Sequence, residues 1–352
     1  MGLSYQDRVL GMLYGSALGD AIGGPWEFLA PKLGAYWKQE ETLDAHKIQQ
    51  LAAQLKLSPY HKSAEPYGVW LDQAPAGTTS DDTRFKAILL QVMKQGRLTG
   101  EGIASAILSY QHQEEELSQK WLNEFREAAK WKLGTGGLPP DRMWGGVESL
   151  MGQMIFLPIA ALYPGKPEKA YLKTWELNIF DTGIAKDLNA VVIAGLAVAL
   201  GGGDWSDVLK QMRQTDPYRF GEAVYGKRSL DNWLDVADEI VYWAKGRPKF
   251  LFDLLEERLE AVMWWEAWVP LVVMYSCYEM CERHPLAAMQ LALEFGHDTD
   301  SYLQLMGAFM GAMYGVEIFP SKMRETLSMQ FLKEYDQSLE EWAEILIKKL
   351  TL

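Results

Sequence analysis

The stretch "GHDTDSYLQLMGAFMGAMYG", residues 296–315, combines acids at its start with glycine at every fourth position near its end. Gly307, Gly311 and Gly315 lie on one face of a helix, because residues four apart are neighbours on the helix surface. Each glycine inside a helix costs about 1 kcal/mol relative to alanine. The close approach of a second backbone offsets this cost, so the stretch predicts a helix at the centre of a helical bundle.

A second stretch, "GMLYGSALGDAIGGPWEF" (residues 11–28), repeats the same glycine spacing. In a membrane this spacing indicates a dimer face. However, a membrane span requires roughly 20 apolar residues. The glycine helix has only 15 uncharged residues after Asp300, and the run "LNAVVIAGLAVALGGG" from Leu188 has only 16. We therefore expect buried core helices, with the two glycine helices packed against each other.

The remaining periodic segments also favour helices. In "DDTRFKAILLQVMKQG" (residues 81–96) the apolar residues recur at spacings of three and four, and no convincing alternating stretch predicts a sheet. The fold class is all-α, and 352 residues without a clear linker predict one domain. The regions at about 30–70 and 204–260 are predicted to be insertions on this core.

Composition limits the partners and the location. The net charge of −13 is spread along the chain, which argues against binding to nucleic acid or an anionic membrane and favours a small molecule. The N-terminus has Asp7 and Arg8 where a signal peptide needs an apolar stretch, so we expect a cytoplasmic protein. Cys277 and Cys281 lie in an apolar helical run and are predicted to be core thiols.

Four aspartates stand at two predicted helix starts: Asp81 and Asp82 before one, and Asp298 and Asp300 before the other. An aspartate at a helix start can accept hydrogen bonds from the free backbone amides there and so cap the helix, but this role needs one acid per helix and not two. Four carboxylates brought together would repel, and two divalent ions would cancel their charges. Oxygen ligands favour Mg²⁺ or Mn²⁺ over zinc. Isoprenoid synthases are all-α enzymes that also bind metal through acids, but their acids stack along one helix face. Because the acids here stand at helix starts, an isoprenoid synthase is a much weaker interpretation than the metal pair described above.

These motifs resemble those of the ADP-ribosylglycohydrolases. "GTTSDDTR" (residues 77–84) and "GHDTDSYLQLMGAFMGAMYG" are similar to the two metal motifs of the family, and "GMLYGSALGDAIGGPWEF" is similar to its N-terminal motif. "FLPIAALYPGKPEKA" and "WEAWVPLVVMYS" also match family segments. The resemblance implies a single-domain orthogonal helical bundle and a metal-dependent glycohydrolase that cleaves an N- or O-glycosidic bond to ribose.

The resemblance also implies a site. Two Mg²⁺ or Mn²⁺ ions would hold the 2- and 3-hydroxyls of a ribose, and Glu27 and Asp300 are the candidate catalytic residues, with Glu27 positioning or deprotonating water. Trp144, Gly145, Gly146 and His297 are the candidate substrate contacts, and Glu266, between tryptophans, is a further candidate. The implied metal ligands are Ser80, Asp81, Asp82, Asp298, Asp300 and Ser301.

The chain departs from the family at the loop that cradles phosphates. The family reads Asn-Gly-x-x-Met-Arg-x-x-Pro-Ile, whereas this chain reads "LMGQMIFLPI" (residues 150–159), without the asparagine and the arginine. The family glycine before Asp298 is His297, and no downstream histidine stands in "FDTGIAKDLNA". The substrate is therefore an ADP-ribose-like or smaller ribosyl compound or an ADP-ribosylated protein. The alternative is a non-catalytic, crystallin-like member of the family that binds metal and ADP-ribose.

Overall fold

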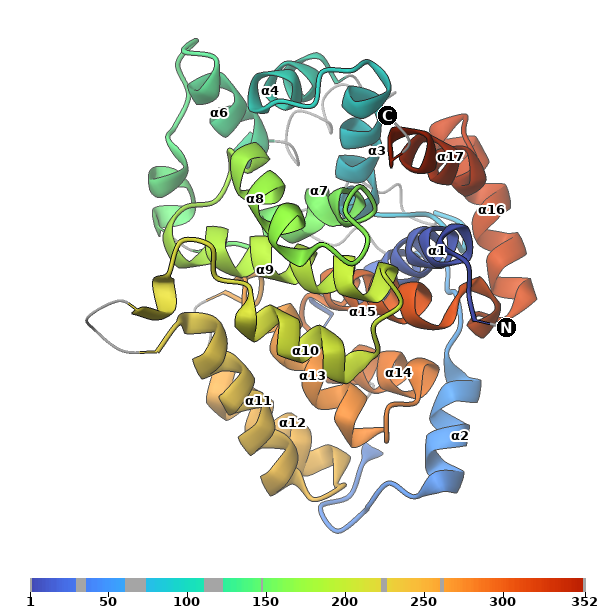
Figure 1. The fold of residues 1–352 in the computed structure, drawn as a ribbon. Coiled ribbons are helices and arrows are strands. Elements are labelled where there is room, and N and C mark those ends of the chain that lie inside the picture. The colour runs from blue at the N-terminus through green and yellow to red at the C-terminus, as the bar shows by residue number, and fades with distance from the viewer. Residues whose placement is uncertain are drawn as a thin grey trace.

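The computed structural model describes residues 2–29, 36–60, 74–110, 123–146, 148–222, 227–259 and 263–350 (Figure 1). Within these ranges the regular structure is helical, apart from an isolated antiparallel bridge between Ser149 and Glu266. The all-α prediction is confirmed. The α-helices are α1 (Tyr5–Gly23), α2 (Ala45–Gln54), α3 (Asp81–Lys94), α4 (Gly100–Ser109), α6 (Asn123–Lys132), α7 (Met151–Ala160), α8 (Pro167–Leu177), α9 (Gly183–Leu200), α10 (Trp205–Gln214), α11 (Ser229–Ala244), α12 (Pro248–Leu259), α13 (Val269–Met280), α14 (Pro285–Phe295), α15 (Thr299–Tyr314), α16 (Ser321–Tyr335) and α17 (Leu339–Leu350). The short 3-10 helices are η1 (Gly24–Trp26), η3 (Pro140–Gly146), η4 (Phe220–Glu222) and η5 (Val316–Ile318).

The two glycine helices, α1 and α15, pack backbone against backbone at the centre of the molecule (Figure 1). A Cβ added at Gly15 would lie 1.9 Å from the carbonyl oxygen of Gly307, and one added at Gly311 would lie 1.9 Å from that of Gly11. The pairing runs in opposite directions along the two helices, so they are antiparallel. The prediction that they pack against each other is confirmed.

This antiparallel pairing brings the end of α1 to the start of α15. A Cβ at Gly23 would lie 2.5 Å from the Cα of Asp300, and the Thr299 hydroxyl donates a hydrogen bond to the Gly23 carbonyl at 2.8 Å. Glu27 follows Gly23 after η1. The glycine packing therefore sets an acid from the N-terminal motif beside the acids of the C-terminal motif.

The start of α3 is tied to the same end of α1. The Asp20 carboxylate accepts hydrogen bonds from the backbone amides of Ser80 (2.8 Å) and Thr83 (3.1 Å). These amides have no partner within α3, so an acid from another helix satisfies them. On the opposite side, Glu334 of α16 accepts a hydrogen bond from the Thr79 hydroxyl at 2.7 Å. The segment that carries Asp81 is thus fixed from two helices.

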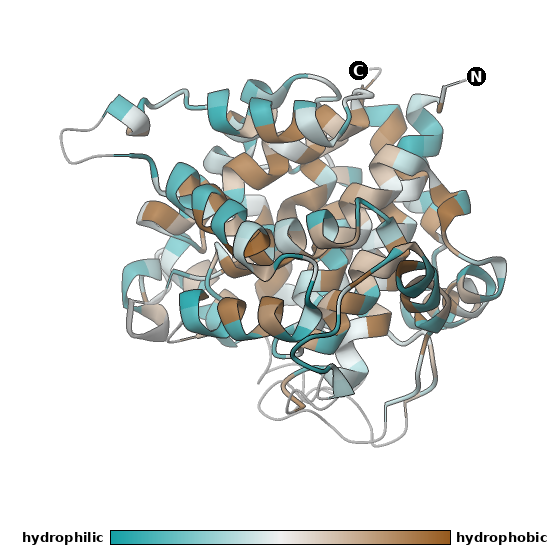
Figure 2. Cartoon of the chain, turned by 90° about the horizontal axis from the view of Figure 1, so that it is seen from below, coloured by the Kyte–Doolittle hydropathy of each residue, from teal (hydrophilic) through white to brown (hydrophobic). Residues whose placement is uncertain are grey.

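Helix α9 is a core helix. By length and composition it could cross a membrane, but 83% of its 18-residue window is buried inside the protein. It packs against α7, α8 and α10. The two cysteines of α13 and its end, Cys277 and Cys281, are free and buried, as predicted. Apolar residues gather in the interior helices while hydrophilic ones lie on the outer faces (Figure 2).

The predicted insertions contain helices where the structure describes them. In the first, residues 30–35 and 61–73 lie outside the described residues, and α2 packs against α14. In the second, α10 and α11 each place a tryptophan inward: the Trp205 indole donates to Glu279 at 2.9 Å, and Trp233 stacks on Trp268. The insertions and the one-domain organisation stay predictions. One buried apolar cluster nevertheless extends from Val9 to Leu346.

Candidate metal centre

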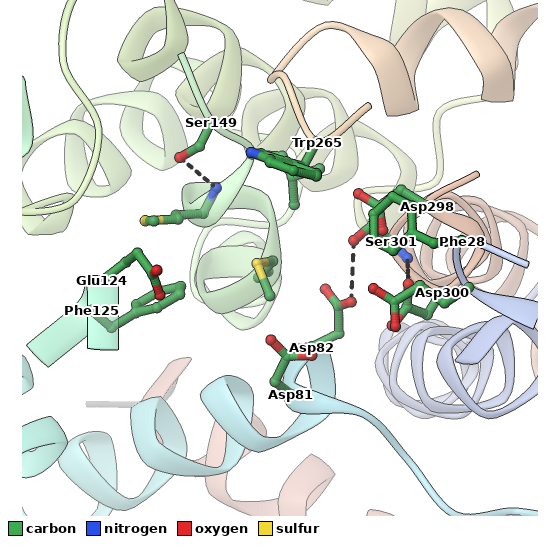
Figure 3. A pocket seen from close by; sticks show the side chains of 14 residues that line it. Phe28, Asp81, Asp82, Glu124, Phe125, Ser149, Trp265, Asp298, Asp300 and Ser301 are labelled. Atoms are coloured by element: carbon green, nitrogen blue, oxygen red, sulfur yellow. Dashed lines mark hydrogen bonds between the residues drawn. The ribbon is translucent and has the colours of Figure 1, made fainter. Parts of the chain in front are cut away.

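Five carboxylates from three segments converge at the end of the glycine helices (Figure 3). Asp81 and Asp82 come from the first turn of α3, and Asp298 and Asp300 from the start of α15. Glu27 follows η1. All except Asp81 are buried, and Asp81 is partly exposed on the wall of a cavity.

The carboxylates form two clusters that share one residue. Ligand oxygens of Glu27, Asp298 and Asp300 lie within 4.8 Å of one another, and so do oxygens of Asp81, Asp82 and Asp300. Two neighbouring groups of oxygen ligands with a common carboxylate fit two hard divalent cations such as Mg²⁺ or Mn²⁺. The acids of the two motifs therefore meet, as the metal prediction requires. Glu27 joins the ligand-forming acids as well as being a candidate catalytic residue.

Polar side chains orient Asp82 within this group. Gln304 donates to its Oδ1 at 2.6 Å and Ser301 to its Oδ2 at 3.2 Å, while Lys86 donates to its carbonyl oxygen at 2.7 Å. Gln304 and Lys86 did not emerge from the sequence alone, nor did Asp20. The spacing in the sequence could have identified Gln304, because it follows Asp300 by four residues and so lies on the same face of α15.

Burial raises the pKa of every acid in the group. Burial and then the charge of Asp20 raise the pKa of Asp81 to about 7, and burial and then the charge of Asp82 raise the pKa of Asp298 to about 8. Burial and the neighbouring carboxylates hold the pKa values of Glu27 and Asp300 well above the ordinary range. Bound cations would reverse this effect, because they favour the ionised carboxylates.

These shifts predict a pH dependence of metal-free stability. In the unfolded chain the aspartates lose their protons near pH 4, whereas Asp81 and Asp298 keep them in the fold up to about pH 7 and 8. The folded state binds more protons at these two acids in this window, so their contribution to stability is fully present below about pH 4 and is lost as the pH rises to about 8. We expect the thermal midpoint in chelator to fall from pH 5 to pH 8, and saturating Mg²⁺ or Mn²⁺ to raise it most at pH 8. A metal-induced increase that was the same at pH 5 and pH 8 would contradict the clustered acids.

The acids form one side of an open cavity, whose space of about 510 Å³ includes the solvent at its mouth. Figure 3 shows Phe125 and Glu124 of α6 across the space from Asp82 and Asp300. The remaining wall is mostly apolar. Its other residues are Phe28, Ser149, Leu150, Met151, Met154 and Trp265.

Buried hydrogen bonds fix this opposite wall. The Asp181 carboxylate accepts from the Ser149 hydroxyl at 2.9 Å, from the Gly152 amide at 2.9 Å and from Asn189 at 2.8 Å. Gln153 in turn donates to Asn189 at 2.8 Å. Asp181 thus satisfies a free amide at the start of α7 and links that helix to Asn189 of α9.

The two serines among the predicted ligands have different surroundings. Ser301 lines the cavity and donates to Asp82. The hydroxyl of Ser80 accepts from the Asp82 amide at 3.2 Å and caps α3. Ser80 is not among the residues that line the cavity. Ligand roles for both serines stay predictions.

His297 lies beside the site with its ring outside the cavity. The ring stacks on Trp264 with centroids 3.6 Å apart and lies 2.6 Å from the Glu256 carboxylate. Its φ of 64° is in the left-handed region that favours glycine, the residue expected here from the family pattern. The stacking and the Glu256 contact hold the histidine in this conformation. Its predicted contact with substrate stays a prediction.

The other predicted residues remain untested. Trp144, Gly145 and Gly146 belong to η3, but their side-chain surroundings lie outside the described part of the chain. Glu266 is buried and pairs with Ser149 through the backbone bridge, which joins the cavity wall to the start of α13. Burial and then the charge of Glu148 raise the pKa of Glu266 to about 7, but Glu266 does not line the cavity.

Comparison with known proteins shows the family and the fold. A family model described as ADP-ribosylglycohydrolase matches residues 1–351. No curated protein matches the chain. A solved structure described as an "ADP-ribosylglycohydrolase-related protein complex" is similar over 98% of this chain and 99% of its own, with a TM-score of 0.61 and 17% identity. At this identity the structural similarity shows the fold alone.

Proposed function

This chain belongs to the ADP-ribosylglycohydrolase family, and we propose that it hydrolyses the glycosidic bond of a ribosyl compound with the help of two divalent cations. The observation that carries the proposal is the sharing of Asp300 between two carboxylate clusters on one cavity wall. The family is generally hydrolytic, which supports a glycohydrolase rather than another metal enzyme.

The described residues fit Mg²⁺ or Mn²⁺. Glu27, Asp298 and Asp300 would hold one ion, and Asp81, Asp82 and Asp300 the other. When bound, the ions would orient the ribose hydroxyls and lower the pKa of a water molecule. Gln304 and Ser301 keep the Asp82 oxygens turned toward this position.

Glu27 would act as the general base of the reaction. Its carboxylate lines the cavity, so it can accept a proton from the attacking water. The water oxygen bonds to the anomeric carbon, and the electron pair of the broken glycosidic bond leaves with the aglycone. The surrounding carboxylates stabilise the positive charge that develops on the sugar ring.

The alternative is a non-catalytic member of the family that binds metal. One observation favours it: Leu150 and Ile155 stand where the family pattern has asparagine and arginine, and Leu150 lines the cavity while Ile155 is buried in the core. The four motif aspartates support metal binding, because clustered carboxylates without cations repel one another. The generally hydrolytic family favours the enzyme.

A hydrolysis assay with Glu27→Gln tests the proposal. Purified protein loaded with Mn²⁺ is incubated with an ADP-ribosylated peptide, a dinucleotide and simple ribosides, and the released sugar is measured by mass spectrometry. We expect turnover of at least one compound, and a fall in kcat of about 10²–10⁴-fold in Glu27→Gln. Glu127→Gln is the control and should leave kcat within a few-fold, because Glu127 pairs with Lys130 and does not line the cavity. Bound metal without turnover of any compound would support the non-catalytic alternative.

A further inference from the structure

The cavity has a negative charge that two divalent ions do not cancel. Six carboxylates line it, namely the five of the metal centre and Glu124. Two divalent ions supply four positive charges. Among the described residues that line the cavity there is no lysine, arginine or histidine. A diphosphate would add negative charge beside these six carboxylates, and none of the described residues that line the cavity offers it a cationic side chain.

The described part of the wall opposite the acids offers few donors for phosphate oxygens. Its side chains are apolar except for Ser149, Glu124 and the indole N–H of Trp265. The Ser149 hydroxyl already donates to Asp181, which leaves it no proton for a ligand. Met151 and Met154 present thioethers, which are weak acceptors and suit apolar or aromatic groups. This wall can bury a flat apolar group at little cost, whereas burying an unpaired phosphate there is costly.

Three aromatic rings line the cavity and favour a planar ligand. Phe28 and Trp265 meet edge to face, with centroids 5.8 Å apart and planes at 85°. Phe125 is held by stacking on Phe85 at 3.6 Å. The three cavity-lining rings are constrained by neighbours, and ring–ring contacts of this kind add to burial when a second planar ring is placed among them.

Glu124 supplies the polar specificity of this wall. It stands in the first turn of α6, lines the cavity and is partly buried, with no hydrogen bond or ion pair to another described side chain. Burial raises the pKa of its carboxyl group. A ligand with positive charge or an N–H group would satisfy this carboxylate, whereas an anionic ligand would not.

From these observations we propose that the substrate is an N-riboside of a planar nitrogen heterocycle without phosphate, and that a cationic heterocycle is preferred over a neutral one. The inference rests on the proposed function. For a pyridinium riboside, water adds its oxygen to the anomeric carbon and the C–N bond breaks. The electron pair stays on the nitrogen, which leaves as a neutral heterocycle. One proton is released through Glu27, so charge and atoms balance without another reactant.

Binding of matched ligands tests the preference independently of turnover. Calorimetry on the Mn²⁺-loaded protein compares nicotinamide riboside, which is cationic, with inosine, which is neutral, and with ADP-ribose. We expect nicotinamide riboside to bind at least about 10-fold more tightly than ADP-ribose, with inosine between them. Tighter binding of ADP-ribose, or binding of none of the three, would overturn the inference.

The variant Glu124→Gln assigns the preference to one side chain. It should weaken binding of nicotinamide riboside about 10-fold while leaving inosine nearly unchanged. The matched control is Glu127→Gln on the same helix, where the carboxylate pairs with Lys130 and does not line the cavity. An equal loss for both ligands would show a structural role for Glu124 and contradict the charge preference.

Ribosides that bind but are never hydrolysed would contradict the proposed function and leave the binding inference standing. Hydrolysis of ADP-ribosyl compounds, together with tighter binding of ADP-ribose than of nicotinamide riboside, would support the proposed function and contradict the binding inference.

Discussion

Asp300→Asn is expected to abolish metal-dependent turnover while leaving the metal-free protein folded. Asp300 belongs to both carboxylate clusters, so its replacement weakens both metal positions at once. Loss of one electrostatic group in an active site alone costs about 10²–10³-fold in kcat, and we expect at least that here. The measurement is kcat on the best substrate together with thermal unfolding in chelator and in Mn²⁺.

Unfolding separates this effect from a loss of fold. The wild-type protein should gain about 2.7 kcal/mol of stability at a metal concentration 100 times the dissociation constant. Asp300→Asn should lose most of that gain. Its metal-free midpoint should rise or stay the same, because one repelling carboxylate is removed. Asp187→Asn is the matched control: Asp187 is a buried aspartate paired with Arg228, outside the cavity wall. This variant should be less stable yet keep the metal-induced gain. An unchanged metal response in Asp300→Asn would contradict the shared site.

Gly15→Ala is expected to be strongly destabilising, by about 3 kcal/mol or more. The new methyl group would lie 1.9 Å from the carbonyl oxygen of Gly307, and backbone cannot move aside as a side chain can. Overpacking of a core commonly costs about 1–3 kcal/mol, and this position belongs at the upper end. Because the contact sets α1 against α15, we also expect weaker metal binding. Denaturant unfolding in chelator and metal titration measure the two effects.

Gly195→Ala is the control for the glycine substitution. Gly195 is also buried within a helix, α9, but its nearest neighbours are side-chain atoms of Met212 at 2.7 Å. A flexible methionine can shift, and alanine improves helix propensity by up to about 1 kcal/mol. Met212 is itself buried and its Cγ must also move, so this variant should cost some stability but clearly less than Gly15→Ala. A similar small effect at Gly15 would show that the two glycine helices do not need their close approach.

The sequence was sufficient for the fold class and for the meeting of the acids. The four-residue glycine spacing predicts close helix packing because only glycine allows it, and the paired aspartates predict cations because buried like charges need them. The contacts that orient the acids were not predictable. Asp20 and Glu334 reach Ser80 and Thr79 from helices distant in sequence, and no periodicity indicates which helix ends meet. The stacking of the His297 ring on Trp264 was not predictable either, because Trp264 lies far from His297 in the sequence, and the predicted contact of His297 with substrate stays a prediction.

The central claim is that two cations occupy adjacent positions on either side of Asp300. Crystals of the protein grown with Mn²⁺, with diffraction data collected at the manganese absorption edge, test it most directly. We expect two anomalous peaks, one among Glu27, Asp298 and Asp300 and the other among Asp81, Asp82 and Asp300. A fully occupied crystal with a single peak, or with peaks only away from these acids, would contradict the account.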